Sequence, residues 1–190
     1  PDPIDVVGYV RWLEQVLIET CAEFGLETER VAGRSGVWVR VGDTHEKVAA
    51  IGIRVSEHVA MHGFALNCNN SLDPYDTIIA CGIRDAKTST LSQLLGKEIT
   101  PLLWITELRT IAADDLWLSG AYQRDSLAIH FTWKKDLAIY PVIEKVEAAL
   151  RPFNYRPHWG KVFTADGKYL SSVYPKMSEF KADRKSTRLN

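Results

Sequence analysis

The amino-acid sequence predicts an α+β fold, and three observations lead to this class. A stretch near the start carries apolar residues at helical spacing. Short segments that alternate in polarity or are uniformly apolar follow it, as expected of strands, and a similar succession begins again after residue 101. A helix followed by clustered strands is typical of α+β proteins.

The first predicted element is an amphipathic helix. Apolar side chains recur at helical spacing from residue 6 to residue 24. Asp2 or Asp5 can cap this helix, Pro3 suits its first turn, and Gly25 ends it.

A β-hairpin is predicted next. Residues 36–41 alternate in polarity, residues 42–44 form a Gly-Asp-Thr turn, and the apolar run 47–56 follows. Two further strands and a short helix ended by Gly96 complete this half; they are expected at 61–66, 77–82 and 91–95.

The second half contains two predicted strands rich in β-branched and aromatic residues, an amphipathic helix stopped by Pro152, a candidate strand and a weaker helix. They are expected at residues 102–111, 126–134, 136–150, 156–163 and 168–180. The segment 96–101 is the one plausible seam between the halves, which predicts domains at 1–100 and 101–183. Residues 184–190 are polar and aperiodic and are expected to be disordered or a non-native scar.

Composition excludes several classes of function. The 190 residues are 46% apolar with a formal net charge of -1, so no basic surface predicts nucleic-acid binding. No apolar run approaches the roughly 20 residues of a membrane span, and no signal peptide precedes the first helix. Three cysteines without a CxxC pair fit a reducing compartment. We therefore expect a soluble, cytoplasmic protein.

Two chemically reactive residues lie in the predicted strands of the first half. Cys81 precedes Gly82 in an apolar run, and Lys47 begins another. A buried cysteine is often only a small apolar residue, and a lysine at a strand end often only faces solvent. If both are buried together, the lysine is driven toward the neutral amine that a general base must be, and the cysteine can act as a nucleophile.

Five segments give the first half its resemblance to the lipoyl(octanoyl) transferase family. Two of them contain Cys81-Gly82-Ile83 and the run KVAAIG that starts at Lys47. The resemblance implies a biotin/lipoate-ligase-like fold without cofactor or metal. It also implies that Cys81 takes octanoate from acyl carrier protein as a thioester, with Lys47 as acid and base, and passes it to a lysine of a lipoyl-domain protein. The acyl pocket would be lined by Arg34, Gly36, His62, Gly63, Ala65 and Asn67.

The first half also departs from this family. Ala80 replaces the proline that precedes the family's cysteine, and the family's upstream RGG…HGPGQ segment is missing, so we expect activity impaired by truncation. His58 and His62 would form a metal site only if they shared a helix face. Cys21 and Cys68 are expected to be packing residues.

Polar residues on the predicted strands of the second half suggest a separate site. Glu107 and Arg109 share one strand face, as a surface salt bridge or as part of a polyol pocket. The segments TELRTIAADDLWLS, DSLAIHFTW and RPHWGKVFT resemble the carboxy-terminal domain of flavin-dependent alditol and arabinonolactone oxidases. That resemblance implies a substrate site of Glu107, Arg109, Thr132 and Lys161, with His130 and His158 in the same motifs.

The oxidase chemistry needs FAD, and no segment resembles the family's FAD-binding domain. This half is then expected to be an oxidase fragment. Two partial enzymes in one chain predict a chimera of two fragments. Besides the acyltransferase and the oxidase fragment, a third alternative is therefore a translated chimera without activity.

Overall fold

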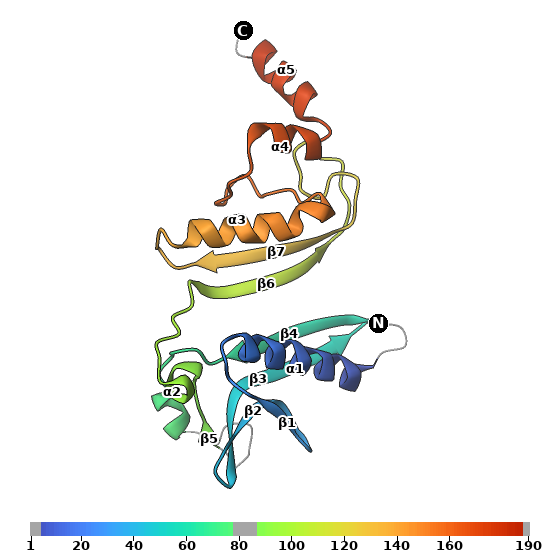
Figure 1. Ribbon diagram of the computed structural model, residues 1–190. Coiled ribbons are helices and arrows are strands. Elements are labelled where there is room, and N and C mark those ends of the chain that lie inside the picture. The colour runs from blue at the N-terminus through green and yellow to red at the C-terminus, as the bar shows by residue number, and fades with distance from the viewer. Residues whose placement is uncertain (1–4, 78–86, 188–190) are drawn as a thin grey trace. The chain divides into compact units, whose positions relative to one another are not determined.

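The structure is a computed structural model that describes residues 5–77 and 87–187, and it separates into two units, Pro1–Thr100 and Pro101–Asn190 (Figure 1). The division falls at the predicted seam. Both units combine helices with antiparallel strands, which confirms the α+β class. The separate ancestry of the two halves stays a prediction.

Helix α1 spans Val6–Glu23 and packs against strands of the first sheet (Figure 1). Of the two predicted caps, Asp5 is the one used, because its Oδ1 accepts the Gly8 N–H at 2.7 Å. The buried face of the helix carries Leu13, Leu17 and Cys21 into the core, together with one charged residue, Glu14.

The sheet of the first unit has the order β1-β2-β3-β4, with β5 added in parallel to β3. The predicted hairpin is confirmed as β2 and β3, and β4 and β5 follow; the three-residue β1 was not predicted. The strands are β1 Glu29–Val31, β2 Arg34–Val41, β3 Thr44–Ser56, β4 Val59–Leu66 and β5 Lys87–Thr88.

A two-residue turn joins β3 to β4. Glu57 and His58 both have positive φ, 49° and 65°, as a type I′ hairpin turn requires. His58 therefore lies in the turn while His62 lies in β4, and they share no helix face. The described residues contain no cluster of His, Cys, Asp and Glu that could hold a metal ion.

The 3-10 helix η1, Asp73–Thr77, and helix α2, Leu91–Leu95, complete the described part of this unit. Thr90 caps α2 by accepting the Gln93 N–H, and Gly96 ends it in the left-handed region at φ 61°, as the sequence predicts. The predicted strand at 77–82 falls almost wholly in residues 78–86, outside the described residues. The core of the unit joins α1 to β2, β3 and α2 through Leu17, Val37, Val48 and Leu91.

The second unit begins with an antiparallel hairpin and continues in helices. The predicted strands at 102–111 and 126–134 and the predicted long helix are confirmed, although that helix begins three residues late. Its elements are β6 Leu103–Ile111, β7 Ser126–Trp133, α3 Ile139–Leu150, η3 Arg151–Phe153, α4 Gly167–Val173 and α5 Met177–Thr187.

Residues 156–163 are a loop, so the predicted strand there is wrong. Side chains rather than a neighbouring strand bind the surrounding backbone. The Arg156 guanidinium donates to the carbonyl oxygens of Val173, Gly120 and Tyr122, and the Trp159 indole donates to that of Leu118. Pro157 and Gly160 also weaken any strand pairing.

The predicted helix at 168–180 is two helices because Pro175 interrupts it. Tyr174 precedes this proline and takes an extended conformation, φ -104° and ψ 97°, as the residue before a proline prefers. Helix α5 then runs through Thr187, so residues 184–187 are helical where disorder was expected. Glu179 in its first turn and Arg184 and Lys185 in its last turn complement the helix dipole.

None of the helices in the described ranges is long and apolar enough to cross a membrane.

The left-handed cap at Gly96 generates the first prediction. Gly96→Ala should lower the free energy of unfolding by about 1 kcal/mol, because a Cβ is strained at φ 61°. Chemical denaturation of the full chain measures this loss. Gly167→Ala is the matched control, since Gly167 starts α4 in open space without a positive φ. Equal free energies of unfolding for the two variants would contradict the role of Gly96 as the left-handed cap of α2.

Candidate functional site

Lys47 is a buried cation at the centre of the first sheet. Its residue is 7% exposed, and its Nζ lies 4.6 Å from the ring centroid of Trp38, which is itself 1% exposed. Trp38 and Lys47 are direct partners in the β2–β3 pairing. An ammonium over a buried indole face is attracted by the ring quadrupole, so Trp38 holds the end of the Lys47 side chain.

A β-bulge turns Lys47 into this position. The β2–β3 pairing joins Val37 to Ala49 and the next residue, Trp38, to Lys47, so Val48 is an extra residue on β3. Alternation is lost there, and Lys47, Val48 and Ala49 are all buried. Bulges of this kind redirect one side chain without ending the sheet.

Gly36 allows β2 to approach β3 next to the bulge. Its φ is 106°, and a Cβ built there would collide with the carbonyl oxygen of Ala49 and lie 3.4 Å from Cε of Lys47. No residue other than glycine fits both the backbone conformation and the space. The Arg34 guanidinium also lies over Trp38, 5.6 Å from the ring centroid.

Polar backbone and side chains border Lys47 on the β5 side. Thr88 pairs with Lys47 in the parallel β3–β5 contact, and the Ser89 N–H donates to the Lys47 carbonyl at 2.9 Å. The Asn67 N–H donates to the Val48 carbonyl at 2.9 Å, and its side chain is buried. Ser89 and Thr90 are buried as well. Thr90 was identifiable in the sequence, because a threonine directly before the run LSQLL is a helix cap.

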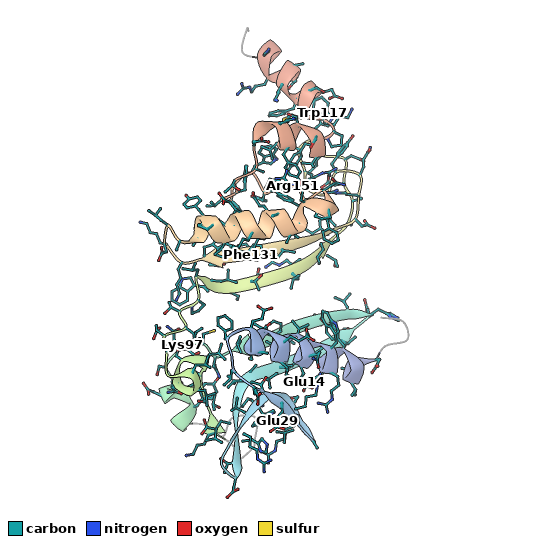
Figure 2. The ribbon with its side chains drawn as sticks, in the orientation of Figure 1. Glu14, Glu29, Lys97, Trp117, Phe131 and Arg151 are labelled. Carbon is teal, nitrogen blue, oxygen red and sulfur yellow. The ribbon has the colours of Figure 1, made fainter. Side chains whose placement is uncertain are left out.

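A buried carboxylate approaches the same region from α1. Glu14, labelled in Figure 2, is fully buried and accepts the Gly36 N–H at 3.0 Å. It also accepts from Arg11 at 2.7 Å and from Arg30 Nε at 3.1 Å. Glu14 was not among the predicted site residues, although its polar side chain among the apolar residues of the helix was an available signal.

The predicted pocket residues of β4 lie farther along the sheet. His62 pairs with Ile53, Gly63 with Gly52 and Ala65 with Ala50. At about 3.3 Å per residue, Ile53 is roughly 20 Å from Lys47 along β3. The structure thus brings Gly36, Arg34 and Asn67 near Lys47 and leaves His62 and Gly63 distant; the acyl-pocket role of the set stays a prediction.

The predicted nucleophile Cys81 lies outside the described residues. The sequence places it six positions before Lys87, the first residue of β5. The next residue of β5 is the one that pairs with Lys47.

The other two cysteines lie within the first unit as packing residues. Cys21 is fully buried in the core, and Cys68 is partly buried against it. Burial raises the pKa of the Cys21 thiol. A buried thiol that resists ionisation is a poor nucleophile.

The residues of the alternative site lie on the β6–β7 hairpin and in one loop of the second unit, and their role as a substrate site stays a prediction. Glu107 accepts a hydrogen bond from Arg109, and its carboxylate lies 3.4 Å from Nδ1 of His130, so the surface salt bridge is confirmed. Thr132 pairs with Ile105 on the same hairpin. Lys161 lies in the loop 156–163, and within residues 101–187 no hydrogen bond or ion pair joins its side chain to the other three. His158 accepts the Gly160 N–H through Nδ1.

Comparison with known proteins places the first unit. The lipoyl protein ligase A/B catalytic domain family matches residues 1–110. An octanoyltransferase of Leifsonia xyli subsp. xyli is 59% identical over 102 residues, which cover 53% of this chain and 46% of the relative. An octanoyltransferase of Salinispora arenicola is 57% identical over 102 residues, which cover 53% of this chain and 48% of the relative. An octanoyltransferase of Mycobacterium leprae is 47% identical over 126 residues, which cover 62% of this chain and 52% of the relative.

These similarities confirm the resemblance of the first half. The chain spans about half the length of the curated relatives it matches. None of the similarities described above concerns an oxidase, so the oxidase ancestry of the second half and the chimera stay predictions.

The burial of Cys21 gives a prediction on thiol reactivity. In the native protein iodoacetamide should leave Cys21 unmodified, even above about pH 8.5 where an ordinary thiol ionises, because its raised pKa and burial both remove the reactive thiolate. Peptide mass spectrometry measures the modification. Cys68, which is partly exposed, is the control thiol, and Cys21 in denaturant is the positive control. Alkylation of native Cys21 at the rate of Cys68 would contradict its assignment as a packing residue.

Proposed function

The chain belongs to the lipoyl protein ligase A/B catalytic domain family, and from this membership we propose that it transfers octanoyl groups in lipoate biosynthesis. The donor is octanoyl-acyl carrier protein, and the acceptor is a lysine of a lipoyl-domain protein. The observation that carries the proposal is the buried Lys47, held over Trp38 beside the strand that follows the Cys81 segment.

The first half-reaction forms a thioester on the protein. The Cys81 thiolate attacks the carbonyl carbon of the octanoyl thioester, a new carbon–sulfur bond forms, and the bond to the donor's sulfur breaks. The departing thiolate takes up the proton that Cys81 lost. Lys47 is the group proposed to carry that proton, as base when the thiol ionises and as acid when the donor leaves.

The second half-reaction transfers the acyl group to an amine. The acceptor lysine attacks the Cys81 thioester, an amide bond forms, and the carbon–sulfur bond to Cys81 breaks. The attacking amine loses one proton and the sulfur regains one, so Lys47 again needs only to relay a proton. A lysine on a rigid, buried strand keeps the fixed position that such a relay requires.

The described surroundings of Lys47 are suited to acyl chemistry. Lys47 and the indole of Trp38 over which it lies are both almost wholly buried, and a site shielded in this way excludes water that would otherwise hydrolyse a thioester. The described residues of the second unit add no observation that favours the flavin oxidase, because Glu107 and Arg109 pair with one another on an exposed hairpin.

The thioester on Cys81 is tested directly by mass. Incubation with octanoyl-acyl carrier protein should add one octanoyl group to the intact protein, and Cys81→Ala should abolish the adduct. Cys68→Ala removes a different thiol and should keep it. An adduct that survives in Cys81→Ala, or that maps to Cys68, would overturn the assignment of the nucleophile.

The role of Lys47 is tested separately. Lys47→Met keeps the aliphatic length of the side chain and should slow octanoyl transfer by about 100-fold or more, the usual cost of removing a general acid–base group. Single-turnover transfer to a lipoyl-domain protein measures the rate. Lys87→Met removes an exposed lysine from the adjoining β5 and should transfer at the original rate. Equal rates in Lys47→Met and Lys87→Met would refute the acid–base role.

A further inference from the structure

Glu14 is a buried ionisable group that the proposed reaction does not use. It lies on α1, 22 positions before Gly36, and its side chain is inaccessible to solvent. Placing a carboxylate in the core costs several kcal/mol unless charges and hydrogen bonds compensate it. The three groups that donate hydrogen bonds to it, from Arg11, Arg30 and Gly36, therefore show which parts of the fold Glu14 holds together.

The Gly36 N–H is the partner that connects Glu14 to the candidate site. In the pairing of β1 with β2 the matched residues are Arg34 and Trp38, so Gly36 falls in the irregular stretch between them. In the pairing of β2 with β3 the matched residues begin at Val37. Gly36 is thus matched with no residue of β1 or β3 in the described register, and its N–H donates to Glu14 Oε1 at 3.0 Å.

This bond fixes the backbone beside the Lys47 side chain. At Gly36, β2 lies so close to β3 that an added Cβ would collide with the Ala49 carbonyl oxygen and lie 3.4 Å from Cε of Lys47. Val37 and Trp38 follow, and between them the register shifts by one residue. A one-residue slip in a strand exchanges its two faces, so the position of this shift decides whether Lys47 is buried over Trp38.

Two arginines hold the Glu14 carboxylate in place. Arg11 donates to Oε2 from the same helix, and Arg30 donates to Oε2 from β1. Arg30 also donates to the Arg11 carbonyl and to Gln15. The carboxylate is thereby fixed to both α1 and β1, and its other oxygen is directed at Gly36.

We propose that Glu14 is a positioning residue for Lys47. By accepting the Gly36 N–H it anchors the bulged register of β2 and β3, and this register buries the Lys47 side chain over Trp38. The catalytic consequence rests on the proposed function of Lys47, whereas the structural consequence does not.

The test measures the accessibility of Lys47 directly. Brief acetylation with acetic anhydride followed by peptide mass spectrometry gives the labelling rate of each lysine without any need for activity. Glu14→Ala should raise the rate at Lys47 about tenfold, because a loosened register exposes a group that local structure otherwise protects. Octanoyl transfer should fall by about 100-fold, as expected when a catalytic group is misplaced by an ångström.

Glu14→Gln and a second buried glutamate serve as matched variants. Glutamine keeps the Oε1 acceptor for Gly36, while Arg11 and Arg30, both partly exposed, can turn to solvent, so Lys47 labelling should stay near the original rate. Glu147 is likewise buried and accepts two hydrogen bonds from Thr164, in the second unit. Glu147→Ala should leave Lys47 labelling unchanged.

Each outcome decides the proposal. A folded Glu14→Ala protein whose Lys47 labels at the original rate overturns it. If Glu14→Ala does not fold, hydrogen exchange of the original protein decides: a Gly36 amide as protected as the interior of α1 supports the anchoring bond, and one that exchanges like an open loop overturns it. Failure of the Cys81 adduct would instead overturn the proposed function and leave the labelling result intact.

Discussion

The close approach of β2 to β3 at Gly36 is the constraint on which the candidate site depends. A side chain at this position would collide with the Ala49 carbonyl, so the strands can lie this close only with glycine in a left-handed conformation. The approach is coupled to the extra residue Val48, and the extra residue places Lys47 on the buried face. Glu14 accepts the Gly36 N–H in this irregular stretch of backbone. Gly36, the bulge at Val48 and Glu14 of helix α1 thus determine the position of the Lys47 side chain together.

The burial of Lys47 sets it apart from an ordinary surface lysine. The residue is 7% exposed, and its Nζ lies over the indole face of Trp38, an attraction worth up to about 2 kcal/mol in a desolvated site. Lysine is almost never fully buried unless its charge is compensated, and sequences retain such locally unfavourable choices mainly where function needs them. The burial of Lys47 therefore favours the acid–base interpretation over a solvated edge residue.

Local signals in the sequence predicted most elements of the first unit. Helical periodicity and the cap at Asp5 predicted α1. The Gly-Asp-Thr turn predicted the β2–β3 hairpin, and Gly96 predicted the end of α2. The prediction could not find the bond between Glu14 and Gly36, because it joins a helix and a strand 22 positions apart and exists only after packing. The bulge was equally hidden, because the apolar run that follows Lys47 does not reveal which of its residues is the extra one.

The loop 156–163 shows a different failure. Its alternating polar and apolar residues resemble a strand, but Arg156 and Trp159 bind carbonyl oxygens at the end of α4 and in the loop before β7. Long side chains that bind distant carbonyls are a tertiary feature, and periodicity carries no information about them.

The second unit depends on the cluster around Tyr174 more than on its hairpin. A two-stranded hairpin is marginally stable alone, and the exposed Glu107–Arg109 pair on it adds at most about 1 kcal/mol. Tyr174 is buried, its hydroxyl donates to the Pro157 carbonyl at 2.6 Å, and its ring packs against Trp159. Burial raises the pKa of the Tyr174 phenol, and the Arg156 guanidinium opposes this, so the group remains a donor. The polar residues of the hairpin thus lie on the weakly supported part of the unit, where a precise substrate site is hardest to maintain.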